Sequence, residues 1–106
     1  MKDCVFCKIV KGEIPSEKEM ETDNLIVFKD IHPKAKIHLL IIPKDHIEDI
    51  RKDNGVIWAS VGKIAIRLAD RLGATGFRLV SNTGTAAEVK HMHIHFLGEV
   101  ELDREL

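Results

Sequence analysis

Three histidines alternate with apolar residues near the end of the chain, at His91, His93 and His95. A β-strand turns successive side chains to opposite faces, so this spacing predicts that the three imidazoles share one face, about 6.7 Å apart. The positions between and after them would face the core, and they hold Met92, Ile94 and Phe96. Imidazole serves as a nucleophile, a general acid or base, or a metal ligand. The pattern therefore favours a reactive or metal-binding site over an inert histidine-rich strand.

A Cys-x-x-Cys pair stands at the opposite end of the chain, as Cys4 and Cys7. In a cytosolic protein such a pair indicates half of a zinc site, a redox pair or a coincidence. A redox pair would need the start of a helix in a thioredoxin-like βαβ unit, which the sequence does not indicate. A structural zinc ion needs four ligands and no second such pair exists, so two histidines would have to complete the site.

Composition excludes several classes of partner. The chain has 106 residues, with 16 Lys and Arg against 17 Asp and Glu. This near balance predicts no electrostatic attraction to nucleic acid or to an anionic membrane. The opening residues show no apolar signal region, and no run approaches the roughly 20 apolar residues of a membrane span. We therefore expect a single domain in the cytoplasm, where the cysteines stay reduced.

The hydrophobic pattern predicts short strands around one long helix. Apolar residues recur at helical spacing through 55–72, and Gly73 is a typical stop signal. A short helical turn is predicted over 4–11. The predicted strands are Lys18–Glu21, Leu25–Asp30, Ile37–Pro43, Phe77–Asn82 and His91–Leu97. These elements predict an α+β fold with a five-stranded antiparallel sheet, one long helix and one or two short ones.

The polar segment 82–90 joins the last two predicted strands. Loops held by rigid strands commonly carry ligand contacts, and a glycine such as Gly84 lets backbone amides approach an anion. By itself the segment reads as an ordinary hairpin loop. Because it leads directly into the three histidines, we interpret it as a cradle for phosphate.

Several motifs together resemble the histidine triad (HIT) superfamily, and most closely its Hint-like branch of nucleotide phosphoramidases. The resemblance rests on residues 4–15, 28–33 and 38–47, on Asn82 and on the histidine run. It implies a single HIT domain over 1–106. It also implies a homodimer in which two sheets join into one continuous ten-stranded sheet.

The resemblance assigns roles to three histidines. His93 would attack the α-phosphorus of a purine nucleoside 5′-phosphoramidate or related ester and form a covalent nucleotidyl-histidine. His95 would bind the phosphate oxygens and stabilise developing charge. His38 would bring a further imidazole to the same face for proton transfer or positioning, although alone it reads equally well as an ordinary buried histidine.

The resemblance also implies a nucleotide site around these histidines. Asp30 would accept the two ribose hydroxyls, and Asn82 would lie near the ribose and phosphate. Glu88 is the nearest match to a polar position that precedes the histidines in the family. The walls of the base pocket would be Ile9, Phe28, Ile31 and Ile42, which would serve equally well as plain core residues.

Many bacterial relatives bind a structural zinc ion at positions that match Cys4, Cys7, His46 and His91. The resemblance therefore implies Zn²⁺ at these residues, with His91 bracing the catalytic strand. The alternative is an unligated pair, as in relatives that lack one cysteine.

The segment between Asn82 and His91 departs from the family pattern. It is shorter than usual, and Ala86, Ala87 and Glu88 replace the usual Gly-Gln and polar residue. This change would alter the backbone donors to phosphate, and a carboxylate there would favour cationic amines over anionic leaving groups.

The alternatives to a phosphoramidase are a dinucleoside polyphosphate hydrolase and a nucleotide-binding or partner-binding protein with weak catalysis. The retained His38, His93 and His95 favour an enzyme.

Two features of the sequence favour dimerisation. One face of the long helix carries Trp58, Gly62, Ala65 and Ala69, a shape suited to close packing against a second chain or the sheet. The strand predicted at 77–82 would pair with its mate across a two-fold axis and remove an open edge. The competing interpretation is a monomer that packs Trp58 internally.

Overall fold

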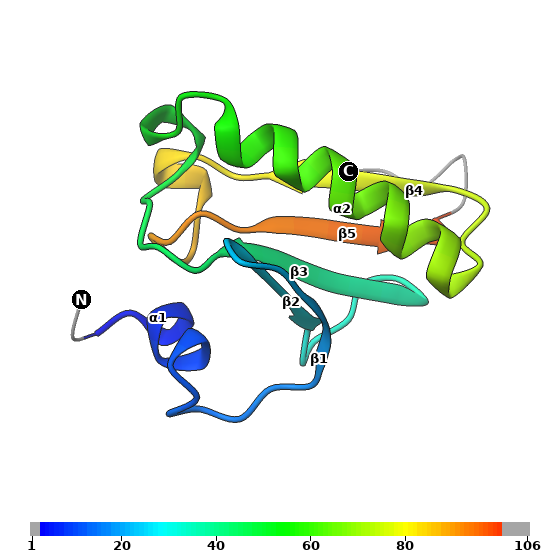
Figure 1. Ribbon diagram of the computed structural model, residues 1–106, viewed down its shortest axis with the longest axis horizontal. Coiled ribbons are helices and arrows are strands. Elements are labelled where there is room, and N and C mark those ends of the chain that lie inside the picture. Colours follow the sequence, from blue (N-terminus) through cyan, green and yellow to red (C-terminus); the bar gives the residue numbers. More distant parts are fainter. Residues whose placement is uncertain (1–2, 101–106) are drawn as a thin grey trace.

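The computed structural model describes residues 3–100, and they form one antiparallel sheet with a helix on each face (Figure 1). The sheet order is β1-β2-β3-β5-β4, and every neighbouring pair is antiparallel. This confirms the predicted α+β class and the five strands. The elements are α1 (Val5–Val10), β1 (Lys18–Glu21), β2 (Leu25–Lys29), β3 (Ile37–Pro43), the 3-10 turn η1 (Ile50–Lys52), α2 (Val56–Leu72), β4 (Phe77–Ser81), the 3-10 turn η2 (Gly84–Ala86) and β5 (Ile94–Gly98).

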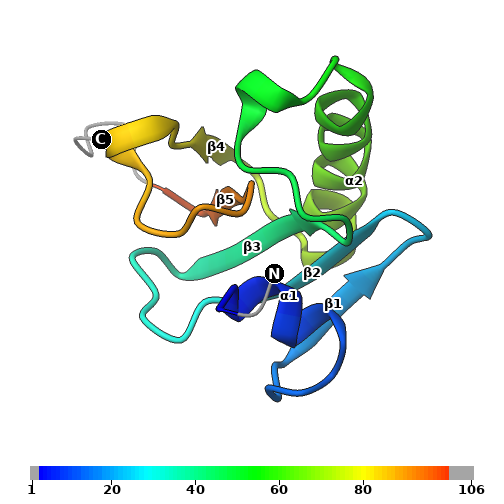
Figure 2. The ribbon, with the colours of Figure 1, turned by 90° about the vertical axis from the view of Figure 1, so that its left-hand side faces the viewer.

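The sheet divides the core into two apolar clusters, because alternate strand residues face opposite sides. Helix α2 covers one face and α1 lies on the other (Figure 2). The cluster on the α2 side includes Leu39, Ile41 and Leu68. The cluster on the α1 side consists of Phe6, Ile26, Phe28, Leu40 and Ile42. His95 pairs with Leu40 of this second cluster, and Phe6 of α1 packs against His93, so these histidines lie on the α1 side.

Helix α2 has the buried face that its spacing predicts. Val61, Ile64 and Leu68 are buried, and Ile57 and Leu72 pack beside them. The helix begins one residue after the predicted start, because Gly55 has a left-handed φ of 96°. It ends at Leu72, and the φ of 67° at the following Gly73 is a conformation that glycine adopts without strain.

The small-residue face of α2 is divided between core and surface. Ala65 and Ala69 pack into the protein's own core, whereas Trp58 keeps 39% of its surface exposed. The monomer interpretation required Trp58 to be packed internally, and the exposed surface of this side chain does not agree with that.

Strand β5 begins later than predicted, at Ile94 and not at His91. The neighbouring strand β3 ends at Pro43, which has no N–H to offer the ladder. The Met92 N–H instead donates to the Ile47 carbonyl at 2.6 Å, so residues 91–93 leave the sheet. Strands β2 and β4 also end one residue before their predicted ends. The alternation survives nonetheless, since Met92, Ile94 and Phe96 all lie in the α2-side core.

Among residues 3–100, no helix combines the length and hydropathy that crossing a membrane requires. The domain limits predicted at 1 and 106 lie outside the described residues.

Candidate functional site

His93 is buried and held in one tautomer by the backbone. Its Nδ1 lies 2.8 Å from the carbonyl oxygen of His91, and only 6% of the surface of His93 is exposed. A carbonyl can only accept, so Nδ1 carries the proton and Nε2 keeps a free lone pair. The Phe6 ring packs edge-to-face with the imidazole, with centroids 5.1 Å apart. This arrangement suits a nucleophilic nitrogen.

His38 and His95 form a directed chain of hydrogen bonds. The Lys34 N–H donates to His38 Nδ1 at 2.9 Å, so a neutral His38 carries its proton on Nε2. That Nε2 lies 2.9 Å from His95 Nδ1 and 3.3 Å from an Asp30 carboxylate oxygen. His95 Nδ1 therefore accepts, and its Nε2 carries a proton. His93 thus offers a lone pair beside an N–H donor on His95, with ring centroids 5.2 Å apart.

The surroundings of His95 favour its neutral form. Burial, followed by the neighbouring imidazoles of His93 and His38, lowers the pKa of His95 below its ordinary value, while Asp30 opposes this. A neutral His95 is the form that accepts from His38 and donates through Nε2. The proton arrangement described above is therefore the favoured one near neutral pH.

The lowered pKa of His95 predicts a loss of stability in acid. The unfolded chain binds this proton more readily than the folded one, so the free energy of unfolding should fall as the pH drops below about 6.5. His95→Gln, whose side-chain oxygen can still accept from His38, should show a smaller loss over the same range. Urea unfolding between about pH 5 and 8 measures both slopes. If the free energy of unfolding depended on pH equally in the two proteins, the lowered pKa of His95 would be contradicted.

The four predicted metal ligands come together beside α1. Their donor atoms all lie within 4.8 Å of one another. Cys4 Sγ lies 3.2 Å from His91 Nδ1, and Cys7 Sγ lies 3.3 Å from His46 Nδ1. Helix α1 sets the cysteines one turn apart, because Cys4 is its N-cap and accepts from the Cys7 N–H. Burial and the neighbouring Cys4 raise the pKa of the Cys7 thiol, so two thiolates here need a cation for balance.

The tautomer of His91 fits metal binding. Its Nε2 lies 2.9 Å from the Pro43 carbonyl, so Nε2 carries the proton and the Nδ1 lone pair points at the sulfurs. Two sulfur and two nitrogen donors match a closed tetrahedral zinc site. A second group, Asp30, His38 and His95, is equally compact. There, however, the backbone of Lys34 places a proton on His38 Nε2, so that group is a hydrogen-bond network and not a metal site.

The comparisons with known proteins agree with this geometry. The family model described as "Scavenger mRNA decapping enzyme C-term binding" matches residues 3–103. A HIT-like protein of Chlamydia trachomatis is 43% identical over 100 residues, which cover 89% of this chain and 90% of the relative. The chain belongs to the histidine triad family. This membership supports a general role in nucleotide binding or hydrolysis.

Two solved histidine triad structures share the fold. A HIT family hydrolase from Clostridium thermocellum is 41% identical with a TM-score of 0.91, over 100% of this chain and 98% of that chain. A zinc-bound histidine triad protein from Mycobacterium smegmatis is 31% identical with a TM-score of 0.86, over 97% of this chain and 79% of that chain.

The predicted nucleotide residues of this histidine triad protein occupy different environments. Asp30 follows β2 and accepts the His32 N–H at 2.8 Å, which orients its carboxylate. Phe28 lies in the α1-side core with 4% exposed, and Ile9 packs against the same cluster. Ile31 is 85% exposed and free to meet a ligand.

The last two predicted nucleotide residues lie on the loop after β4. Asn82 directly follows Ser81, and Ser81 pairs with Ile94, the residue after His93. Glu88 is exposed. The loop therefore borders the histidines from the β4 side.

Sequence reasoning did not identify which residues supply the backbone groups that set the proton positions: Lys34 N–H, Pro43 C=O and His91 C=O. No sequence signal identifies them, since every residue has a carbonyl and almost every residue an N–H. It also missed the Phe6 ring, which packs edge-to-face with both His91 and His93.

Proposed function

We propose that this protein hydrolyses nucleoside 5′-phosphoramidates, or related nucleotidyl conjugates, at the α-phosphate, as in the Hint-like branch. The observation that carries the proposal is the hydrogen bond from His93 Nδ1 to the His91 carbonyl. It leaves Nε2 as a lone pair next to the N–H of His95, which is what a nucleophile and a phosphate-binding group need.

In the proposed mechanism His93 Nε2 attacks the α-phosphorus, the new N–P bond forms and the P–N bond to the amine breaks. The amine leaves with a proton from solvent, which the attacking water of the next step returns, so His95 and His38 keep the N–H groups of their hydrogen-bonded chain. Water then attacks the phosphorus, releases the nucleoside 5′-monophosphate and restores His93. Throughout, His95 donates to a phosphate oxygen, where negative charge develops.

The proposed nucleotide site surrounds this centre. Asp30 accepts the ribose hydroxyls, with its position supported by the His32 N–H and by His38. Ile9, Phe28 and Ile31 line the base, and Asn82 approaches the ribose and phosphate. The exposed Glu88 favours cationic leaving groups.

We also propose one structural Zn²⁺ per chain, held by Cys4, Cys7, His46 and His91. The compact donor set and the tautomer of His91 support it, as does the zinc-bound relative. When bound, zinc would supply a fixed charge and geometry and would not take part in the chemical step. His91 connects this site to the nucleophile, because its carbonyl holds His93.

Steady-state hydrolysis of adenosine and guanosine 5′-phosphoramidate tests the proposal, with release of the nucleoside monophosphate as readout. Diadenosine polyphosphates are the comparison substrates. Faster cleavage of the polyphosphates would favour the dinucleoside polyphosphate hydrolase. Tight binding of AMP without turnover of either substrate would favour a nucleotide-binding protein.

We expect a symmetric homodimer that joins two sheets through β4 into one ten-stranded sheet. Strand β4 is the last strand of the sheet, and Phe77 on it and Trp58 on α2 keep exposed apolar surface. An open strand edge with apolar neighbours favours pairing with a second copy. Size-exclusion chromatography with light scattering at micromolar concentration should give twice the mass of one 12.0 kDa chain. A mass near that of one chain would refute the dimer.

A further inference from the structure

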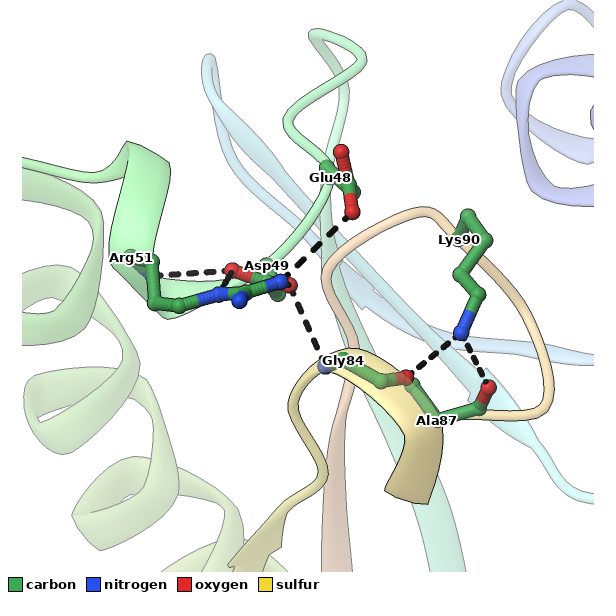
Figure 3. A network of polar contacts seen from close by, with 6 residues as sticks. All are labelled: Glu48, Asp49, Arg51, Gly84, Ala87 and Lys90. Atoms are coloured by element: carbon green, nitrogen blue, oxygen red, sulfur yellow. Dashed lines mark hydrogen bonds and ion pairs between the residues drawn. The ribbon is translucent and has the colours of Figure 1, made fainter.

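A buried carboxylate outside the proposed nucleotide site fastens the loop that leads to the histidines (Figure 3). Asp49 is 2% exposed. It accepts three hydrogen bonds from Arg51: from N and Nε to Oδ1, both at 3.0 Å, and from Nη2 to Oδ2 at 2.7 Å. Its Oδ2 also faces the Gly84 N–H at 3.4 Å. Asp49 therefore joins the segment before α2 to the loop after β4.

The charge of Asp49 persists throughout the physiological pH range. The hydrogen bonds from Arg51 hold the pKa of this carboxyl well below its usual range, although burial opposes them. A buried ionised carboxylate is costly unless its partners stay in place. Displacing Gly84 would remove one of these partners, so the carboxylate resists movement of the loop.

A second set of hydrogen bonds holds the loop at Gly84. Lys90 Nζ donates to the carbonyls of Gly84 at 2.5 Å and Ala87 at 2.9 Å. The Ala87 N–H also donates to the Gly84 carbonyl, which closes the turn η2. Gly84 is thus held through its N–H by Asp49 and through its carbonyl by Lys90 and Ala87, while its φ of 62° suits glycine.

The segment that carries Asp49 also holds the far end of the loop. The Ile47 carbonyl accepts the Met92 N–H, and His46 belongs to the cysteine and histidine cluster with His91. Residues 46–49 therefore bind the 82–90 loop near its start, at Gly84, and the chain just after its end, at Met92. His93 follows immediately.

We propose that Asp49 is a positioning residue that sets the conformation of the 82–90 loop and thereby its affinity for the nucleotide phosphate. This inference rests on the proposed function, because it takes the 82–90 loop to bind the nucleotide phosphate. Asp49 acts at a distance, through the Gly84 backbone. Groups that bind phosphate equally in the ground and transition states alter KM more than kcat.

Asp49→Asn tests the proposal, because it keeps the size of the side chain and removes its charge. The new amide NH₂ would face the donors of Arg51 or Gly84. We expect the Kd for AMP and the KM for adenosine 5′-phosphoramidate to rise about tenfold, with kcat changed much less. Amide hydrogen exchange, measured without nucleotide, should quicken over residues 82–90, while zinc content stays that of the wild type.

Glu48→Gln is the matched control. It removes the same charge from the neighbouring residue, whose carboxylate lies 3.7 Å from Arg51 Nη2, against 2.7 Å for Asp49 Oδ2. Its AMP affinity, KM and loop exchange should equal those of the wild type. Should Asp49→Asn fail to fold, Asp49→Glu keeps the charge and shifts the acceptor by one methylene, and a rise in Kd of a few-fold is then expected.

The outcomes separate the two proposals. A folded Asp49 variant with wild-type AMP affinity or wild-type loop exchange overturns the role of Asp49. Equal effects of Glu48→Gln would also overturn it, because the charge alone would then be responsible. A wild type that binds AMP without hydrolysing phosphoramidates overturns only the proposed function, and one that binds no AMP overturns both.

Discussion

Replacing His93 by alanine should abolish turnover of adenosine 5′-phosphoramidate and leave AMP binding nearly intact. The substitution removes the only nitrogen proposed to form a bond to phosphorus, while Asp30, His95 and the 82–90 loop remain. Loss of a covalent nucleophile costs several powers of ten in rate, and each power corresponds to about 1.4 kcal/mol of barrier. Single-turnover and steady-state assays, with AMP affinity by calorimetry, measure both effects.

His32→Ala is the matched control for the nucleophile. His32 is an exposed imidazole close in sequence to Asp30, and the bond that it gives Asp30 comes from its backbone N–H. This variant should keep wild-type turnover. Mass spectrometry of the quenched wild type should detect a nucleotidyl adduct that His93→Ala lacks. A His93→Ala protein that retains more than about one hundredth of the wild-type rate would refute the covalent mechanism.

Removing the proposed zinc ion should produce the largest change in stability. Binding of a structural zinc contributes directly to folding, and in small zinc domains it amounts to roughly 10 kcal/mol or more. Cys7→Ser and His91→Ala should each lose the metal and lower the free energy of unfolding by several kcal/mol. Metal analysis of protein purified without a histidine tag, combined with urea unfolding, measures both quantities.

The catalytic effect of losing zinc should be much smaller than its effect on stability. The His91→Ala variant keeps the backbone carbonyl that accepts from His93 Nδ1. At a temperature where the variant is folded, turnover per folded molecule should stay close to that of the wild type. His32→Ala again controls for loss of an imidazole as such. A zinc-free wild type that remains folded and equally stable would refute the structural role.

The sequence by itself determined which helices and strands form and the two faces of the sheet. Strands β1 and β3 have the predicted bounds, and α2 differs by one residue from the prediction. Alternation at period two correctly assigned Met92, Ile94 and Phe96 to the core. These features depend on local periodicity and on stop signals such as Gly73, which act over a few residues. The grouping of Cys4 and Cys7 with His46 and His91 also followed from motifs, through the resemblance to a known family.

The tertiary structure alone decided where β5 begins and which nitrogens carry protons. The late start of β5 depends on the Ile47 carbonyl, 45 positions away from the Met92 N–H that it accepts. The tautomers of His38, His91 and His93 depend on backbone groups of other residues, which look alike in every sequence. Asp49 became visible only when the chain brought it to Gly84. Spacing along the chain reports which face a side chain occupies, but a hydrogen bond between distant segments exists only once the fold has brought them together.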